Sequence, residues 1–141
     1  MKSESAKTLV LQVGVKVLLR DAKGNYLLLH RSPEKYPGTA GTWDIPGGRI
    51  NPGTSLLENL KREVKEETGL LVVGEPKLIA AQDILRGEKH VVRLTYVGEA
   101  SGEVQLDTEE NDSFEWSSKE EMKENADLDV FLKEVLIKNS F

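Results

Sequence analysis

The chain contains no cysteine, so disulfide bonds and thiolate metal sites are excluded. It also has no apolar run approaching the roughly 20 residues that span a bilayer. The first residues, MKSESAKT, are polar and lack the apolar centre of a signal peptide. We therefore expect a cytoplasmic protein with no membrane partner.

An excess of positive charge is also missing. The sequence has 24 acidic and 19 basic residues, a formal net charge of −5. This balance argues against binding to a nucleic acid polymer, which usually requires a basic face. It does not argue against a small phosphorylated substrate, because a bound divalent cation can supply the positive charge. The length of 141 residues suits one domain, which we expect to span residues 1–141.

Hydrophobic and turn patterns predict an α+β fold. Val- and Leu-rich segments predict strands that flank the turns DAKGN and RGEK, and two shorter segments are further strand candidates. Three segments predict helices, of which the last is amphipathic. The predicted strands are 9–19, 26–31, 76–85, 90–100, 103–106 and 113–116, and the predicted helices are 55–68, 117–122 and 129–137.

The helix at 55–68 has the clearest signals and an unusual charge pattern. Ser55 and Glu58 form a capping box, and Gly69 supplies the stop. Glu63, Glu66 and Glu67 are three and four residues apart, so they share one face. Three carboxylates beside a core-facing stripe repel one another unless a cation lies among them, and Mg²⁺ prefers such oxygen ligands. The competing interpretation is a solvated helix face with ordinary intrahelical ion pairs.

The spacing from Gly48 to Leu70 distinguishes these interpretations. The segment resembles the Nudix box, G-x5-E-x7-R-E-U-x-E-E-x-G-U, in which U is a bulky aliphatic residue. Gly48 matches the first position, and the closing block matches in full. The matching closing residues are Arg62, Glu63, Val64, Glu66, Glu67, Gly69 and Leu70.

This resemblance implies a Nudix-type α/β/α sandwich, with a mixed sheet between helices. It also implies Mg²⁺ or Mn²⁺ as the cofactor. Glu63, Glu66 and Glu67 would be the metal ligands, together with the backbone carbonyl of Gly47, and Arg62 would orient the glutamates. A metal held there would lower the pKa of a water molecule and neutralise phosphate oxygens.

The general base is expected outside the box. Many Nudix proteins use a glutamate in a loop that precedes a strand ending in an aromatic residue. Here TEENDSFEW offers Glu109 and Glu110, and the spacing to FEW favours Glu110. The alternatives are an acidic surface loop, or Glu66 or Glu67 acting as the base.

The sequence offers three candidate residues for substrate recognition. Arg31 ends a predicted strand and is a candidate phosphate ligand, although exposed arginines often make surface pairs. Trp43 and Tyr36 are candidates for stacking on a base, although Trp43 suits a core or loop anchor at least as well. The subfamily motifs of other Nudix hydrolases are mostly absent, which favours a nucleoside triphosphate pyrophosphohydrolase by elimination. The resemblance implies a small-molecule nucleotide as substrate and is compatible with a homodimer.

Two residues of the box region bear on activity. Thr54 stands where the box has its first glutamate, so the alternative function is a Nudix-fold nucleotide-binding module with weakened catalysis. A third hypothesis is a scaffold whose charged helix only faces water. Asn59 shares the carboxylate face, and we interpret it as a tolerated surface residue.

Overall fold

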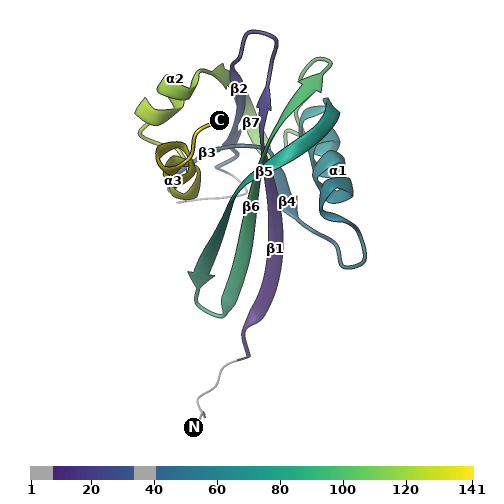
Figure 1. Ribbon diagram of the computed structural model, residues 1–141, viewed down its shortest axis with the longest axis vertical. Coiled ribbons are helices and arrows are strands. Elements are labelled where there is room, and N and C mark those ends of the chain that lie inside the picture. The colour runs from purple at the N-terminus through teal and green to yellow at the C-terminus, as the bar shows by residue number, and fades with distance from the viewer. Residues whose placement is uncertain (1–7, 34–40) are drawn as a thin grey trace.

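The computed structural model describes residues 8–33 and 41–141. Within these ranges the chain forms a seven-stranded sheet flanked by three helices (Figure 1). In chain order the elements are β1 (Val10–Arg20), β2 (Tyr26–Arg31), β3 (Trp43–Asp44), β4 (Gly47–Arg49), α1 (Leu56–Thr68), β5 (Leu71–Arg86), β6 (Lys89–Ser101), β7 (Asn111–Ser117), α2 (Lys119–Glu124) and α3 (Val130–Lys138).

The sheet is mixed, as expected. Its strands follow the order β3-β2-β1-β6-β5, while β4 pairs with β1 and β7 pairs with β2. The central strands β1 and β6 are parallel, and the other pairs are antiparallel. Helix α1 covers one face, and α2 and α3 cover the other (Figure 1). The predicted α+β sandwich is therefore confirmed.

Side-chain alternation along the central strands creates two cores. Val17 and Leu19 face α1, where they pack with Leu60 and Val64 of that helix. Leu18 faces the opposite side and belongs to the cluster that includes side chains of α2 and α3. All of these side chains are buried. Because successive side chains of a strand point to opposite faces, the same strand packs against both layers of helices.

The helix predictions are confirmed, whereas one strand prediction is wrong. Helix α1 begins after the Ser55 cap, with both bonds of the capping box present, and ends at Gly69 in the left-handed conformation. Residues 103–106 form no strand. Instead, Gln105 N–H donates to Thr68 O (2.7 Å), so the backbone of this segment bonds to the open carbonyls at the end of α1.

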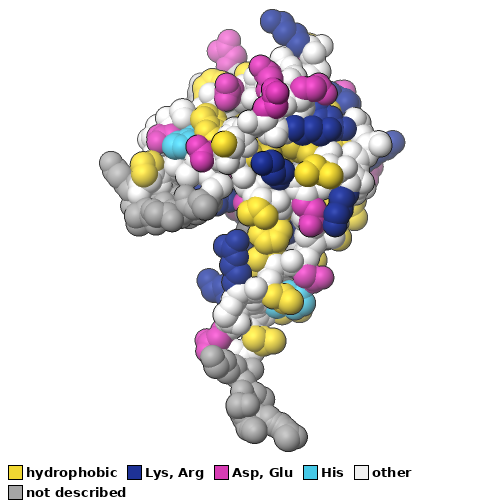
Figure 2. All heavy atoms as spheres, turned by 90° about the vertical axis from the view of Figure 1, so that its left-hand side faces the viewer, with side chains coloured by type: hydrophobic (Ala, Val, Ile, Leu, Met, Phe, Trp, Pro, Cys, Tyr) yellow, Lys and Arg dark blue, Asp and Glu magenta, His cyan; other side chains and the backbone are white. Residues whose placement is uncertain are grey.

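The β5–β6 hairpin and the start of β1 form an arm that extends beyond the helices (Figures 1 and 2). Leu9, Leu11 and Leu85 are exposed apolar side chains in this part of the chain. Ile84 and Val91, by contrast, line a cavity beside α3. No helix in the described ranges has the length and apolar character that a membrane crossing requires.

Candidate active site

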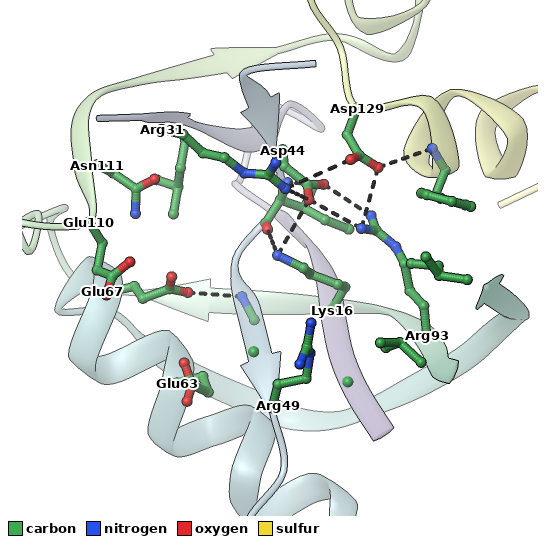
Figure 3. A pocket seen from close by; sticks show the side chains of 18 of the residues that line it. Lys16, Arg31, Asp44, Arg49, Glu63, Glu67, Arg93, Glu110, Asn111 and Asp129 are labelled. Atoms are coloured by element: carbon green, nitrogen blue, oxygen red, sulfur yellow. Dashed lines mark hydrogen bonds and ion pairs between the residues drawn. The ribbon is translucent and has the colours of Figure 1, made fainter. Parts of the chain in front are cut away.

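A cavity of about 680 Å³ lies between the box, the sheet and the start of α3. This volume is within the range of small-ligand sites. Its carboxylates at one end come from α1 and from the loop that precedes β7, and include Glu63, Glu67 and Glu110 (Figure 3). Lys16 and Arg93 reach it from the sheet. The cavity is therefore polar and contains charges of both signs.

Glu63 is held by a close approach of strand and helix. A Cβ built on Gly48 would lie 2.7 Å from Glu63 Oε2, so only glycine leaves room for this carboxylate. Arg62 contacts Glu63 Oε1 at 3.1 Å and Glu66 Oε1 at 3.0 Å. The Arg62 guanidinium thus contacts two glutamates of the box.

Glu67 is the box glutamate whose pKa is raised by its surroundings. Gly47 N–H donates to Glu67 Oε1 at 2.9 Å. Burial raises the pKa of Glu67 to about 7; Lys16 and the Gly47 bond oppose the rise, whereas Glu63 and Glu110 add to it. A cation placed among these carboxylates would offset both the cost of burying the charged form of Glu67 and the repulsion between the carboxylates.

Glu66 and the loop glutamates occupy different positions. The side chain of Glu66 lines the cavity but is 58% exposed, more than that of Glu63 at 19%. Glu110 lines the cavity and is close enough to influence the Glu67 carboxyl. Glu109 is exposed and lies outside the cavity lining. Of the two loop glutamates, Glu110 therefore lies at the cavity and Glu109 does not.

The donor set suits a hard divalent cation that completes its coordination with a ligand. Among residues 8–33 and 41–141, no three acidic or histidine side chains form a ready-made metal cage. Mg²⁺ does not require one, because it takes one or two protein carboxylates and binds water and substrate phosphates for the rest. Glu63 and Glu67, at the end of the cavity that the glycines keep open, fit this requirement.

A buried ion-pair network, which the sequence analysis did not identify, forms another wall of the cavity. Asp44 accepts two bonds from Arg93, at 3.0 and 3.1 Å, and one from Arg31 at 2.9 Å. Asp129 contacts Arg93 at 3.3 Å and caps α3 through the N–H groups of Phe131 and Leu132. These residues lie far apart in sequence, and no motif marks them.

Charge pairing explains how these groups tolerate burial. Burial alone would raise the pKa of Asp44, but Arg93, Lys16 and Arg31 together lower it well below its usual range. Burial likewise opposes the charge of Arg93, and Asp44 and Asp129 offset this, so that its pKa is raised. Arg93 Nε is buried and has no hydrogen-bond partner within the described part of the chain.

The candidate substrate ligands separate in space. Arg31 lines the cavity, with its guanidinium on Asp44. Trp43 does not line it; its ring packs 4.9 Å from that of His30, and its backbone bonds to Asp127 and Asp129. Trp43 therefore anchors this loop and lies outside the cavity lining. Tyr36 lies outside the described residues.

Asn59 is not a surface residue, and our interpretation of it is wrong. It is fully buried. Its side chain accepts from Asn51 N–H (2.9 Å) and Arg62 (3.1 Å) and donates to the carbonyls of Thr54 and Ser55. An amide is suited to this position because it both donates and accepts. Asn59 therefore ties the loop of the box to its helix.

The Thr54 side chain does not contribute to the cavity. Thr54 is absent from the cavity lining, and its carbonyl is bonded to Asn59. Glu63, Glu66 and Glu67 line the cavity although Thr54 departs from the box pattern.

Comparison with known proteins identifies the family. A sequence model of the NUDIX domain matches residues 10–137. The chain therefore belongs to the Nudix hydrolase family. Its structure is similar to that of the MutT protein from Methanosarcina mazei Go1, with 31% identity, a TM-score of 0.80, and 94% of this chain and 95% of that chain covered.

Two named relatives share shorter regions. A Bacillus subtilis (strain 168) protein named putative 8-oxo-dGTP diphosphatase is 32% identical over 77 residues, 54% of this chain and 50% of that protein. The Mus musculus protein named 8-oxo-dGDP phosphatase NUDT18 is 58% identical over 31 residues, 22% of this chain and 10% of that protein. Each match thus covers half of the named relative or less.

Proposed function

We propose that the protein is a metal-dependent hydrolase that cleaves a phosphoanhydride bond of a nucleoside triphosphate and releases a monophosphate and pyrophosphate. The observation that carries this proposal is the convergence of Glu63, Glu67 and Glu110 at one end of a nucleotide-sized cavity. The names of the two relatives support a nucleotide substrate. The binding module remains the second hypothesis, but the position of Thr54 outside the cavity lining gives it no support.

The residues of the cavity suit distinct tasks. Glu63 and Glu67, with Glu66 and the carbonyl of Gly47, would hold Mg²⁺ or Mn²⁺, and Arg62 would fix the glutamates through its two ion pairs. The cation, when bound, supplies charge neutralisation for the diphosphate and lowers the pKa of a water molecule. Glu110 would accept the proton of that water, because it lies at the same end of the cavity as Glu63 and Glu67.

The test is a hydrolysis assay with a matched control. Phosphate and pyrophosphate release is measured over nucleoside triphosphates, including 8-oxo-dGTP, and over dinucleoside polyphosphates and nucleotide sugars, with Mg²⁺ and with Mn²⁺. The Glu67→Gln variant keeps the shape of the side chain but removes the charge, and we expect it to lose at least a hundredfold in kcat (about 3 kcal/mol). Glu75→Gln makes the same change at an exposed position of β5 and is expected to match the wild type.

The outcomes separate the hypotheses. Metal-dependent release from a few compounds, lost only in Glu67→Gln, supports the hydrolase. Tight nucleotide and metal binding without release supports the binding module. Release that is unaffected by chelation or by Glu67→Gln contradicts the proposed site.

A further inference from the structure

Lys16 lies on the floor of the cavity between the box carboxylates and Asp44 (Figure 3). It stands opposite Gly47 in the register of β1 and β4. A Cβ on Gly47 would lie 2.9 Å from Lys16 Cδ, so the lysine stem occupies the space that glycine leaves. The same Gly47 donates its N–H to Glu67. Strand pairing therefore holds the Lys16 ammonium beside the proposed metal ligands.

The Lys16 ammonium retains the ability to donate to a ligand. It has three N–H donors. In the described part of the chain it contacts two acceptors, the carbonyl of Ile45 at 3.2 Å and Asp44 Oδ2 at 3.4 Å. Its side chain is 20% exposed, whereas those of Asp44 and Arg93 are 4% and 6% exposed. Lys16 therefore presents a charged donor to the cavity that the deeper members of the network do not present.

The charges of the network favour an anion at this point. Lys16, Arg31 and Arg93 bring three positive side chains to this wall of the cavity, where they contact the carboxylates of Asp44 and Asp129. Positive side chains in a cavity wall attract anions, because charge-assisted hydrogen bonds are roughly twice as strong as neutral ones. Phosphoryl oxygens accept such bonds, and the proposed diphosphate site adjoins these side chains.

We propose that Lys16 binds the phosphoryl group that joins the nucleoside to the metal-bound end of the substrate, an inference that rests on the proposed function. The same cavity is lined by Ile84, Val91 and Phe131 of β5, β6 and α3. A nucleoside bound among these apolar side chains, with its diphosphate at Glu63 and Glu67, would place the intervening phosphoryl group beside Lys16. The ammonium would donate to a non-bridging oxygen of the phosphoryl group that remains on the monophosphate product.

The test compares ligands that differ by one phosphoryl group. Calorimetry in the presence of Mg²⁺ measures the affinity of dGMP and of deoxyguanosine for the wild type, Lys16→Met and Lys16→Gln. Both variants are expected to bind dGMP about tenfold or more weakly and deoxyguanosine with unchanged affinity. The ratio of the two affinities is internal to each variant, so a partly destabilised protein still reports it. Lys23→Met removes the same charge in the β1–β2 turn, outside the cavity, and is expected to keep the wild-type ratio.

Kinetics on the same preparations complete the test. With dGTP, the Lys16 variants are expected to show a raised KM and a smaller change in kcat, because the contact is made before and after cleavage. If the wild type hydrolyses dGTP and the Lys16 variants lose affinity equally for dGMP and deoxyguanosine, Lys16 has a structural role alone and this inference is overturned. If the wild type neither binds dGMP nor hydrolyses any triphosphate, both the proposed function and this inference are contradicted.

Discussion

At the scale of single residues, Asp44 shows how a buried charge is stabilised in this protein. Its carboxylate is 4% exposed and lies within 3.4 Å of Lys16, Arg31 and Arg93. Removing one partner from a buried pair leaves an uncompensated charge, which costs more than the pair contributes. Asp44 is therefore expected to matter for stability as well as for the shape of the cavity.

The Asp44→Asn variant is expected to lose about 3 kcal/mol or more in free energy of unfolding at pH 7, because Arg93 loses its charged partner. The sign of the pH effect follows from the lowered pKa of Asp44. Its stabilisation is present above the pKa of the unfolded chain, near 4, and is lost below it as pH falls toward the folded pKa. The difference between wild type and variant is thus expected to shrink by about 1.4 kcal/mol per pH unit below pH 4.

Urea unfolding at pH 7, 4 and 3 measures this difference. Asp127→Asn, at an exposed position, is the control and is expected to show a difference near zero at each pH. A difference for Asp44→Asn that stays constant between pH 7 and pH 3 would contradict the argument.

At the scale of elements, the approach of β4 to α1 determines the geometry of the box. The Glu63 carboxylate lies where a side chain at Gly48 would be, and Arg62 contacts it from the same helix. Asn59 fastens the preceding loop to α1 from the buried side. The positions of the candidate metal ligands therefore depend on backbone contacts between two elements.

Gly48→Ala tests this dependence. The new Cβ would lie 2.7 Å from Glu63 Oε2, so the carboxylate has to move. We expect Mn²⁺ affinity to fall about tenfold, in the range seen when the support of a ligand is disturbed. Gly14→Ala is the matched control, because its Cβ would meet its nearest neighbour at an ordinary 3.7 Å.

Electron paramagnetic resonance measures free Mn²⁺ in both variants, and thermal unfolding verifies that each is folded. Unchanged affinity in a folded Gly48→Ala protein would show that Glu63 does not hold the metal from the position seen here.

At the scale of the whole molecule, the cavity depends on both helical layers. Helix α1 supplies the box carboxylates from one face of the sheet. On the other face, Asp129 caps the start of α3 and pairs with Arg93. Each layer is held by its own apolar core. Damage to the α3 core is therefore expected to reach the cavity through Asp129.

Leu132→Ala removes a fully buried side chain of the α3 core. We expect it to lower the free energy of unfolding by about 2–5 kcal/mol, through lost burial and the cavity left behind. Ile137 lies in the same helix but is 70% exposed. Ile137→Ala is the control and is expected to change the free energy of unfolding by less than about 0.5 kcal/mol. Denaturant unfolding of both variants measures the difference, and equal losses would contradict the packing argument.

The accuracy of the sequence predictions follows the range of the interactions involved. The capping box of Ser55 and Glu58 was predictable because its bonds join residues three positions apart. The segment 103–106 has strand-like residues but bonds to the end of α1, a partner that local propensity does not specify. Asn59 was misinterpreted although three of its bonding partners lie only four to eight residues away, because they bond to its side chain only once the loop of the box is folded.

The sequence by itself determined the helix of the box, its shared face of glutamates and the alternation of side chains along the strands. These features depend on periodicity and on neighbours a few residues away. Only the tertiary structure decided that Asp44, Arg93 and Asp129 meet, and that Lys16 stands beside Glu67. The physical reason is that these contacts join separate elements, so they exist only once strand register and helix packing have brought those elements together.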